Sequence, residues 1–242
     1  MTGVTISPVR GLPELREGDD LAGMIVERAD LEDGDIVVVA QKAISKIEGR
    51  IVRLDDVEPS ARAQELAGDG DPRRVEVILG EAKRVVRNRG SLLITETRHG
   101  FVCASSGVDA SNAPKPGAVV LLPVDPDASA ARLRSALGEL TGCEVGVVVS
   151  DSFGRPWRQG TTDIAVGAAG IEVLRDLKGL HDPNGYELKS TVIAVADEIA
   201  GAAELVLGKL DRTPVAILRG LDARGDGRAT DLVMPSDRDL FR

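Results

Sequence analysis

The sequence has 242 residues, of which 43% are hydrophobic and 29% charged, as in an ordinary globular protein. The 39 acidic residues outnumber the 30 Lys and Arg residues, and the formal net charge of −9 argues against a non-specific nucleic-acid surface. Aromatic residues make up only 2% of the chain, which leaves few platforms for base stacking. We therefore expect no nucleic-acid partner, although the basic residues are numerous enough to cluster locally around a phosphate.

The cysteines and the lengths of the hydrophobic runs indicate the cellular compartment in which the protein is found. Cys103 and Cys143 lie far apart and follow no metal-ligand spacing, so free buried thiols in a reducing compartment are expected. No apolar run reaches the roughly 18 residues that a membrane span needs, and the N-terminus shows no signal peptide. These features predict a cytoplasmic protein without a membrane partner. The length suits a single domain over residues 1–242 that contains two intimately joined subdomains.

Turn residues divide the first half of the chain into short elements. Helical spacing predicts a helix over residues 21–29 with an Asp cap, and a charged surface helix over residues 72–86. Residues 55–71 are expected to begin as a short helix and to end in a loop. Apolar runs predict strands over residues 4–9, 36–40, 51–54, 91–97, 101–104 and 119–124, the fourth and fifth joined as a hairpin.

The second half alternates longer helices with strands. Thr161, Thr162 and Asp163 are possible helix caps, and the small residues at 165–170 permit close packing. The tail at 222–231 is expected to be mobile or ordered by a ligand. Helices are predicted over residues 130–140 and 197–206, and strands over residues 145–149, 190–195 and 214–218. Because a strict βαβ rhythm is lacking, we expect an α+β fold of mixed sheets with flanking helices.

Two strand-to-turn segments carry candidate metal ligands. The buried strand at 145–149 runs directly into Asp151 and Ser152, and Asp109 and Asn112 lie three residues apart in a second polar segment. Two carboxylates and a hydroxyl are hard oxygen ligands that suit Mg²⁺ or Mn²⁺. The alternative interpretation is that these are ordinary turn residues at strand ends.

Basic residues follow two of the predicted strands. Lys42 and Lys46 lie four residues apart after the strand at 36–40, and Arg155 and Arg158 flank Trp157. Together with the carboxylates, such cations suit metal-assisted phosphoryl transfer. A solvated helix start and arginines stacked on a tryptophan are the structural alternatives. The P-loop, Gly-x-Gly-x-x-Gly and Gly-x-Ser-x-Gly motifs are all absent.

Several segments resemble the coenzyme F-420 γ-glutamyl ligases. Residues 150–170, SDSFGRPWRQGTTDIAVGAAG, are similar to the signature of that family. LITETRHGFVCA at 93–104, GVDASN at 107–112, AQKAISK at 40–46, GLPE at 11–14 and ADEI at 196–199 match as well. The likeness covers nearly the whole chain in order, and it implies an α+β fold of two entwined subdomains and a homodimer. Some relatives carry a fused nitroreductase-like domain, which is not expected in a chain that stops at Arg242.

The resemblance implies a GTP-dependent ligase that forms a C–N bond. In the family, GTP phosphorylates the terminal carboxylate of F-420-0, and the amine of L-glutamate attacks the acyl phosphate, which releases phosphate and GDP. Further glutamates are added through γ-linkages. The expected partners are therefore F-420-0, L-glutamate and GTP, with two Mg²⁺ or Mn²⁺ ions as cofactors.

The resemblance also assigns site residues, position by position. Asp109, Asp151 and Ser152 match catalytic metal ligands, and Ser152 keeps the hydroxyl of the Thr that is usual there. Lys209 stands where some relatives have Gln or Glu near a second metal. Arg155, Trp157 and Arg158 are assigned as a hypothesis to the anionic substrate or the triphosphate. Nucleotide-contacting positions match Leu12, Pro13, Glu14, Leu15, Gln41, Lys42, Lys46 and Asn112, and the guanine-nucleotide loop matches Val206, Leu207, Gly208, Lys209, Leu210, Asp211, Arg212 and Thr213.

Two rival functions use the same residues. One is a metal-dependent phosphotransferase or phosphohydrolase that acts on another small molecule. The other is a non-catalytic nucleotide-binding protein. Dependence of GTP turnover on both F-420-0 and glutamate distinguishes the ligase from the first rival, and metal-dependent turnover distinguishes it from the second.

Overall fold

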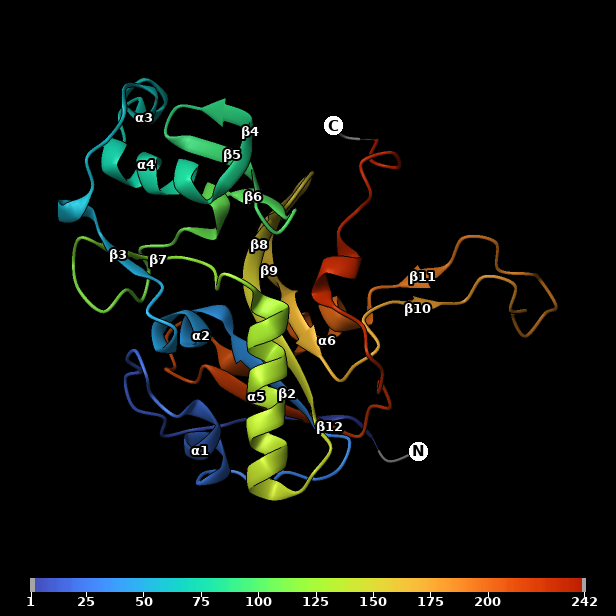
Figure 1. Ribbon diagram of the computed structural model, residues 1–242. Helices are drawn as coiled ribbons and strands as arrows, with labels where there is room; N and C mark the ends of the chain where they lie inside the picture. Colours follow the sequence, from blue (N-terminus) through green and yellow to red (C-terminus); the bar gives the residue numbers. More distant parts are fainter. Residues whose placement is uncertain (1–2, 241–242) are drawn as a thin grey trace.

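A mixed five-stranded sheet forms the centre of the computed structural model, which describes residues 3–240 (Figure 1). Its strand order is β1 (Thr5–Pro8), β12 (Val215–Arg219), β2 (Ile36–Ala40), β8 (Gly146–Arg155) and β9 (Arg158–Ala169). Only β2 and β8 are parallel; the other neighbours run antiparallel. The mixed sheets with flanking helices confirm the predicted α+β class.

Helices cover both faces of this sheet. Helices α1 (Leu21–Val26), α2 (Gln41–Ile47) and α5 (Pro126–Thr141) pack on one face, and α6 (Val195–Leu207) packs on the other. Successive residues of β2 alternate between them: Val37 and Val39 join the α5 core, whereas Ile36 and Val38 join the α6 core. A strand that is buried on both faces has a continuous run of apolar residues, which explains the sequence of β2 and of the first half of β8.

Residues 51–121 form a smaller lobe beside the main sheet (Figure 1). Its core includes Leu54, Ile78 and Leu93 and is separate from the two main clusters. The lobe contains β3 (Ile51–Arg53), η1 (Leu54–Asp56), α3 (Ala61–Ala67), α4 (Pro72–Glu81), β4 (Ala82–Arg89), β5 (Leu92–Thr97), β6 (Val102–Ala104), η2 (Ser105–Gly107) and β7 (Ala118–Val120). Two lobes with their own cores are present, and the assignment of residues 1–242 to one domain stays a prediction.

The long hairpin of β8 and β9 corrects one prediction. Thr161, Thr162 and Asp163 cap no helix, because they lie in β9 and pair with Gly154, Phe153 and Ser152 of β8. The prediction of close packing at the small residues is confirmed. A Cβ atom on Gly167 would lie 2.3 Å from the carbonyl oxygen of Pro126, at the start of α5. Only glycine therefore lets α5 approach β9 this closely.

The helix predicted over residues 72–86 is also corrected. Helix α4 ends at Glu81, and Ala82–Arg89 is strand β4, which pairs with β5 through a turn at Gly90. Helical spacing continued across this boundary, but pairing with β5 overrode it. Asp20 caps α1 by accepting a hydrogen bond from the Gly23 backbone N–H, as predicted.

Residues 222–231, which were predicted to be mobile or ordered by a ligand, contact the main lobe. This segment ends in a turn of 3₁₀-helix, η3 (Ala229–Leu232), and Ala229 is fully buried. The buried carboxylate of Asp127 accepts hydrogen bonds from the Ala229 backbone N–H and the Thr230 hydroxyl. Because Asp127 lies in the first turn of α5, this contact ties the C-terminal segment to the main lobe.

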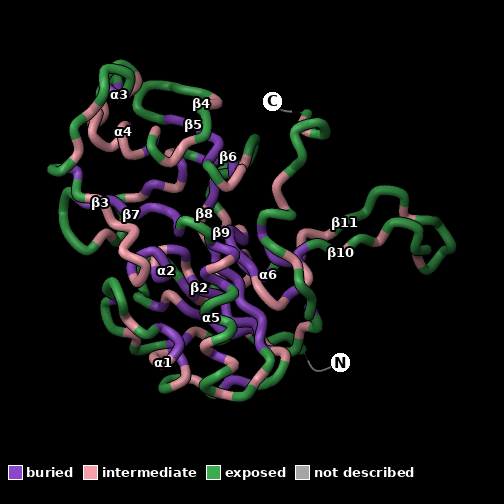
Figure 2. Tube along the Cα trace, viewed as in Figure 1, coloured by how far each residue is buried: buried purple, intermediate pink, exposed green. Residues whose placement is uncertain are grey.

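A two-stranded ribbon of β10 (Arg175–Asp176) and β11 (Val192–Ile193) projects from the main lobe and is largely exposed (Figures 1 and 2). Only two residues of the strand predicted over residues 190–195 are therefore in a strand, Val192 and Ile193. Among residues 3–240, none of the helices combines the length and apolar character that crossing a bilayer requires. Cys103 and Cys143 are free thiols, Cys103 buried and Cys143 partly so.

Candidate active site

A cleft of about 760 Å³ opens where β2 and β8 end. These strands are parallel and in register from Ile36 opposite Gly146 to Ala40 opposite Ser150. Their carboxyl ends therefore meet at one edge of the sheet, where ligands of open sheets commonly bind. Lys42, in the first turn of α2, and Asp151, on β8, line the cleft together. The pairing register brings these side chains together although 109 positions separate them in the sequence.

The structure brings most of the predicted site residues to this cleft. Five predicted side chains besides Asp109 do not line it: Val206, Asp211, Arg155, Trp157 and Arg158. Those that line it are Leu12, Pro13, Glu14, Leu15, Gln41, Lys42, Lys46, Asn112, Asp151, Ser152, Leu207, Gly208, Lys209, Leu210, Arg212 and Thr213.

Asp109 joins the cleft through Lys42. The Nζ atom of Lys42 lies 2.6 Å from Asp109 Oδ2 and 2.6 Å from the Ser111 hydroxyl. The Asp109 backbone is fixed because its N–H and carbonyl both bond to Val120 of β7. Partial burial would raise the pKa of Asp109, but hydrogen bonds from Lys42 and Ser111 outweigh this and hold that pKa below its ordinary value. Asp109 is therefore ionised at neutral pH.

Asp151 differs from Asp109, because its pKa is raised and not lowered. Loss of hydration raises the pKa of Asp151 to about 7, against the lowering effects of the Ser152 backbone N–H and Lys42. The neighbouring carboxylates of Asp163 and Asp109 raise this pKa further. Burial, and then the charge of Asp151, also raises the pKa of the Cys103 thiol to about 12, so that thiol is protonated and a poor nucleophile. Lys42 is the cation whose charge acts on Asp151, but loss of hydration outweighs it.

Asp163 is a cleft residue that the sequence did not single out for this role. Its side chain is only 6% exposed, and its two carboxylate oxygens accept hydrogen bonds from the Ser152 hydroxyl at 2.6 Å and the Ser150 hydroxyl at 2.9 Å. Glu204 of α6 accepts from the Asp163 backbone N–H. The β-branched residues around Asp163 are typical of a strand and were the available signal.

Mixed charges surround the rest of the cleft. Lys46 forms an ion pair with Glu14 at 2.5 Å, which links α2 to the N-terminal loop. Gln41 is buried, and its side-chain amide donates to the Ser45 hydroxyl and the Leu121 carbonyl. Beyond α6, the hydroxyl of Thr213 donates to the carbonyl of Leu207 and closes the loop that carries Lys209 and Arg212.

Arg155, Trp157 and Arg158 lie at the tip of the β8–β9 hairpin. Trp157 occupies the turn with a φ of 57° and is 82% exposed. Arg155 donates to the Gln159 carbonyl at 3.2 Å, across that turn. The structure does not bring these residues to the cleft of their own chain, and their role toward substrate stays a prediction.

The oxygen atoms that line the cleft could supply some, but not all, of the ligands of a divalent cation. Within residues 3–240, His, Cys, Asp and Glu side chains form no group of three or more arranged to hold a metal ion by themselves. However, Asp151, Asp163 and Asp109 interact electrostatically around a partly buried position with Lys42 as the neighbouring cation. Magnesium typically uses one or two carboxylates and completes its shell with water and substrate phosphates. These residues fit that kind of site.

Comparison with known proteins agrees with the resemblance. A family model described as F420-0:Gamma-glutamyl ligase matches residues 11–220. The coenzyme F420:L-glutamate ligase of Methanopyrus kandleri is 48% identical over 245 residues, which cover 98% of this chain and 97% of the relative. The protein of the same name from Methanocaldococcus jannaschii is 45% identical over 236 residues, with 96% and 94% covered. This chain therefore belongs to the F420-0:gamma-glutamyl ligase family.

Proposed function

We propose that this protein is a GTP-dependent ligase that joins L-glutamate to coenzyme F420-0 and then adds further glutamates through γ-linkages. Family membership and the names of the relatives support the ligase activity. The observation that carries the mechanism is the cleft at the ends of β2 and β8, where carboxylates and lysines converge. GTP as phosphoryl donor and an acyl phosphate as intermediate follow from the family resemblance.

The proposed reaction has two steps. A carboxylate oxygen of F420-0 attacks the γ-phosphorus of GTP, the bond from that phosphorus to the β–γ bridging oxygen breaks, and GDP leaves. The amine nitrogen of glutamate then attacks the acyl carbon, a C–N bond forms, and inorganic phosphate leaves while the amine loses a proton. Since GTP supplies the activating phosphoryl group, no other co-reactant is needed.

The basic residues of the cleft would hold the triphosphate. Lys42, Lys46, Lys209 and Arg212 all line the cleft, and phosphoryl transfer depends mainly on positioning and charge neutralisation. Lys42 is already fixed by Asp109 and Ser111, so little side-chain entropy is lost when a phosphate binds. We infer that Lys42 positions the phosphoryl group that is transferred.

Asp109, Asp151 and Ser152 would hold Mg²⁺ or Mn²⁺, which when bound neutralises phosphate charge and polarises the phosphorus–oxygen bond. Asp163 prepares Ser152 for this role. A serine hydroxyl has one proton and two lone pairs, and Asp163 accepts the proton of Ser152 at 2.6 Å. The lone pairs therefore remain available to a cation. Lys209 at the second metal position would leave that ion to water, phosphate and other side chains.

Product analysis tests the function. Purified protein is incubated with F420-0, GTP, glutamate and Mg²⁺ or Mn²⁺, and products are identified by mass spectrometry alongside GDP and phosphate release. The ligase predicts glutamylated F420 and GDP release that requires both co-substrates. GTP hydrolysis without F420-0 and glutamate would favour a phosphohydrolase, and GTP binding without turnover would favour a non-catalytic protein. Sedimentation of the same preparation tests the proposed homodimer.

A further inference from the structure

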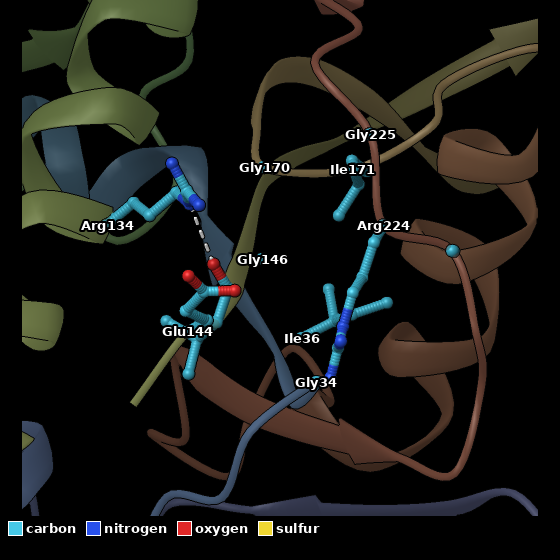
Figure 3. A pocket seen from close by; sticks show the side chains of 11 residues that line it. Gly34, Ile36, Arg134, Glu144, Gly146, Gly170, Ile171, Arg224 and Gly225 are labelled. Atoms are coloured by element: carbon cyan, nitrogen blue, oxygen red, sulfur yellow. Dashed lines mark hydrogen bonds between the residues drawn. The ribbon is translucent and has the colours of Figure 1, made fainter. Parts of the chain in front are cut away.

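A small hollow lies at the end of β2 and β8 opposite to the cleft (Figure 3). Ile36 and Gly146, the first residues of the two strands, form part of its floor, whereas Ala40 and Ser150 line the cleft at their other ends. The hollow has a volume of about 90 Å³. It is therefore separate from the proposed nucleotide site and too small to enclose a nucleotide.

Two arginines lie on opposite walls of this hollow (Figure 3). Arg134 of α5 is held in place because its Nε donates to the Val145 carbonyl at 2.9 Å. It crosses the backbone of Gly170 so closely that a Cβ there would lie 2.3 Å from the same Nε. Arg224, from the C-terminal segment, lies over Gly34 in a similar way, with Nη2 3.1 Å from an added Cβ. Both glycines have positive φ angles, which favour glycine on their own account.

Neither guanidinium has an anionic partner among residues 3–240. Arg134 makes only the backbone hydrogen bond, and Arg224 makes no side-chain hydrogen bond or ion pair with the described part of the chain. Arg219, one strand away, shows the usual solution in this acidic protein, since it pairs with Asp35 and Glu32. Both arginines are exposed, and an anion bound in the hollow would give them the partner that they lack.

We propose that this hollow binds a phosphate group, either as inorganic phosphate or at the end of a small phosphate monoester. Its volume is about three times the ~30 Å³ that one water molecule occupies in the liquid, which suits a tetrahedral oxyanion. The donors are the guanidinium groups, because the backbone N–H groups of Gly34 and Gly146 already bond to Glu144 and Asp35. Planar guanidinium groups match the geometry of phosphate oxygens.

The side chain of Glu144 also lines the hollow, on the wall of Arg134 (Figure 3). Its negative charge weakens anion binding and leaves a net charge of +1 on the three side chains. Removal of the Glu144 charge should therefore raise the affinity of the hollow for phosphate, whereas removal of the arginines should lower it. If only the shape of the hollow mattered, loss of the charge at Arg134, Arg224 or Glu144 would change the phosphate affinity in the same direction.

The test follows backbone amide signals by NMR while inorganic phosphate is added at constant ionic strength. Signals of Gly34, Gly146, Gly170 and Gly225 report on the hollow, and Gly208 reports separately on phosphate in the cleft. A parallel titration with glycerol phosphate distinguishes free phosphate from a monoester, and the tighter of the two identifies the source. The wild-type protein is expected to show saturable shifts at the four hollow glycines.

Three variant proteins test the proposal: one double variant and two single variants. Arg134→Gln with Arg224→Gln should weaken phosphate binding at the hollow about tenfold or more, because two charge-assisted hydrogen-bonding groups are lost. Glu144→Gln should tighten it a few-fold. Arg132→Gln, on the same helix but paired with Glu48 outside the hollow, is the matched control and should leave it unchanged. Absence of saturable shifts at the hollow glycines, or equal binding in the double variant with its fold intact, would overturn the proposal.

Discussion

The base and the tip of the β8–β9 hairpin contrast sharply, although only a few residues separate them. At the base, Asp151 is partly buried, and the hydroxyl of Ser152 is bonded to the buried carboxylate of Asp163. At the tip, Trp157 is 82% exposed, and the Arg155 side chain donates to the Gln159 carbonyl of the same turn. The polar residues from 150 to 158 are thus divided between two environments.

This difference shows that contact with other elements, more than polar composition, defines the site. The base meets Lys42 of α2 and Asp109 of the smaller lobe through the pairing of β2 with β8 and the contact of Asp109 with β7. The tip extends beyond the last residue of β2, so β2 cannot bring a partner to it. Substitutions at the base should therefore affect catalysis, and those at the tip should affect it much less.

Asp151→Asn should have the largest effect. The amide keeps the shape of the side chain but cannot supply a negative charge to a metal ion. We expect turnover to fall by at least about a hundredfold, as when a main electrostatic stabiliser is removed, while circular dichroism and thermal unfolding stay near wild type. Unchanged metal-dependent turnover would contradict the assignment of Asp151 as a ligand.

Lys42→Met should separate phosphate stabilisation by Lys42 from metal binding by Asp109. The methionine fills similar space but removes the cation that is bonded to both Asp109 and Ser111. Turnover with GTP is expected to fall about 10- to 100-fold through loss of phosphate stabilisation, whereas Mn²⁺ affinity should be kept or increased because Asp109 loses a competing partner. Electron paramagnetic resonance measures Mn²⁺ binding. A parallel loss of metal and turnover would contradict this role.

Asp163→Asn tests whether Asp163 positions Ser152. The amide can donate a hydrogen bond back to Ser152 and misdirect its lone pairs, and loss of such an outer partner typically costs 10- to 100-fold in metal affinity. We expect Mn²⁺ binding to weaken by about that amount. Ser150→Ala removes the other hydroxyl on Asp163 and is the matched control, with little effect expected. Equal effects of the two variants would argue for a merely structural carboxylate.

The raised pKa of Asp151 predicts a pH dependence. Below about pH 7 the folded protein keeps a proton on this carboxyl that a bound cation must displace, so metal binding should release a proton and strengthen as the pH rises to about 7. Between the ordinary value of 3.8 and about 7, the folded state binds more protons than the unfolded state. This carboxyl therefore lowers the free energy of unfolding as the pH rises through that window. Calorimetry in buffers of different ionisation enthalpy measures the proton, and its absence at pH 6 would contradict the shift.

Arg158→Ala at the tip should have the smallest effect. One exposed charge contributes at most about 1 kcal/mol to binding, so KM for the anionic F420-0 is expected to rise by no more than about fivefold with kcat and Mn²⁺ affinity unchanged. A loss of kcat comparable with that of Asp151→Asn would place the tip in the reaction centre and break the contrast between tip and base.

Much of this arrangement was predictable from the sequence, for physical reasons. Strands β2 and β8 are buried on both faces, so their apolar runs are unambiguous, and Asp151 and Asp109 follow strand-like segments. Asp163 was interpreted as a helix cap, because Thr-Thr-Asp also suits a helix start and its position opposite Ser152 depends on the register of the β8–β9 pair. Likewise, Ala82–Arg89 became a strand only by pairing with β5. The hollow between Arg134 and Arg224 depends on packing of segments 90 residues apart, which no local pattern indicates.

Product analysis by mass spectrometry tests the central claim most directly. Wild-type protein with F420-0, GTP, glutamate and a divalent cation should yield F420 species heavier by one or more glutamyl units, with one GDP released for each unit, and Asp151→Asn should yield almost none. Release of GDP at the same rate without F420-0 or glutamate, with no glutamylated product, would contradict the account.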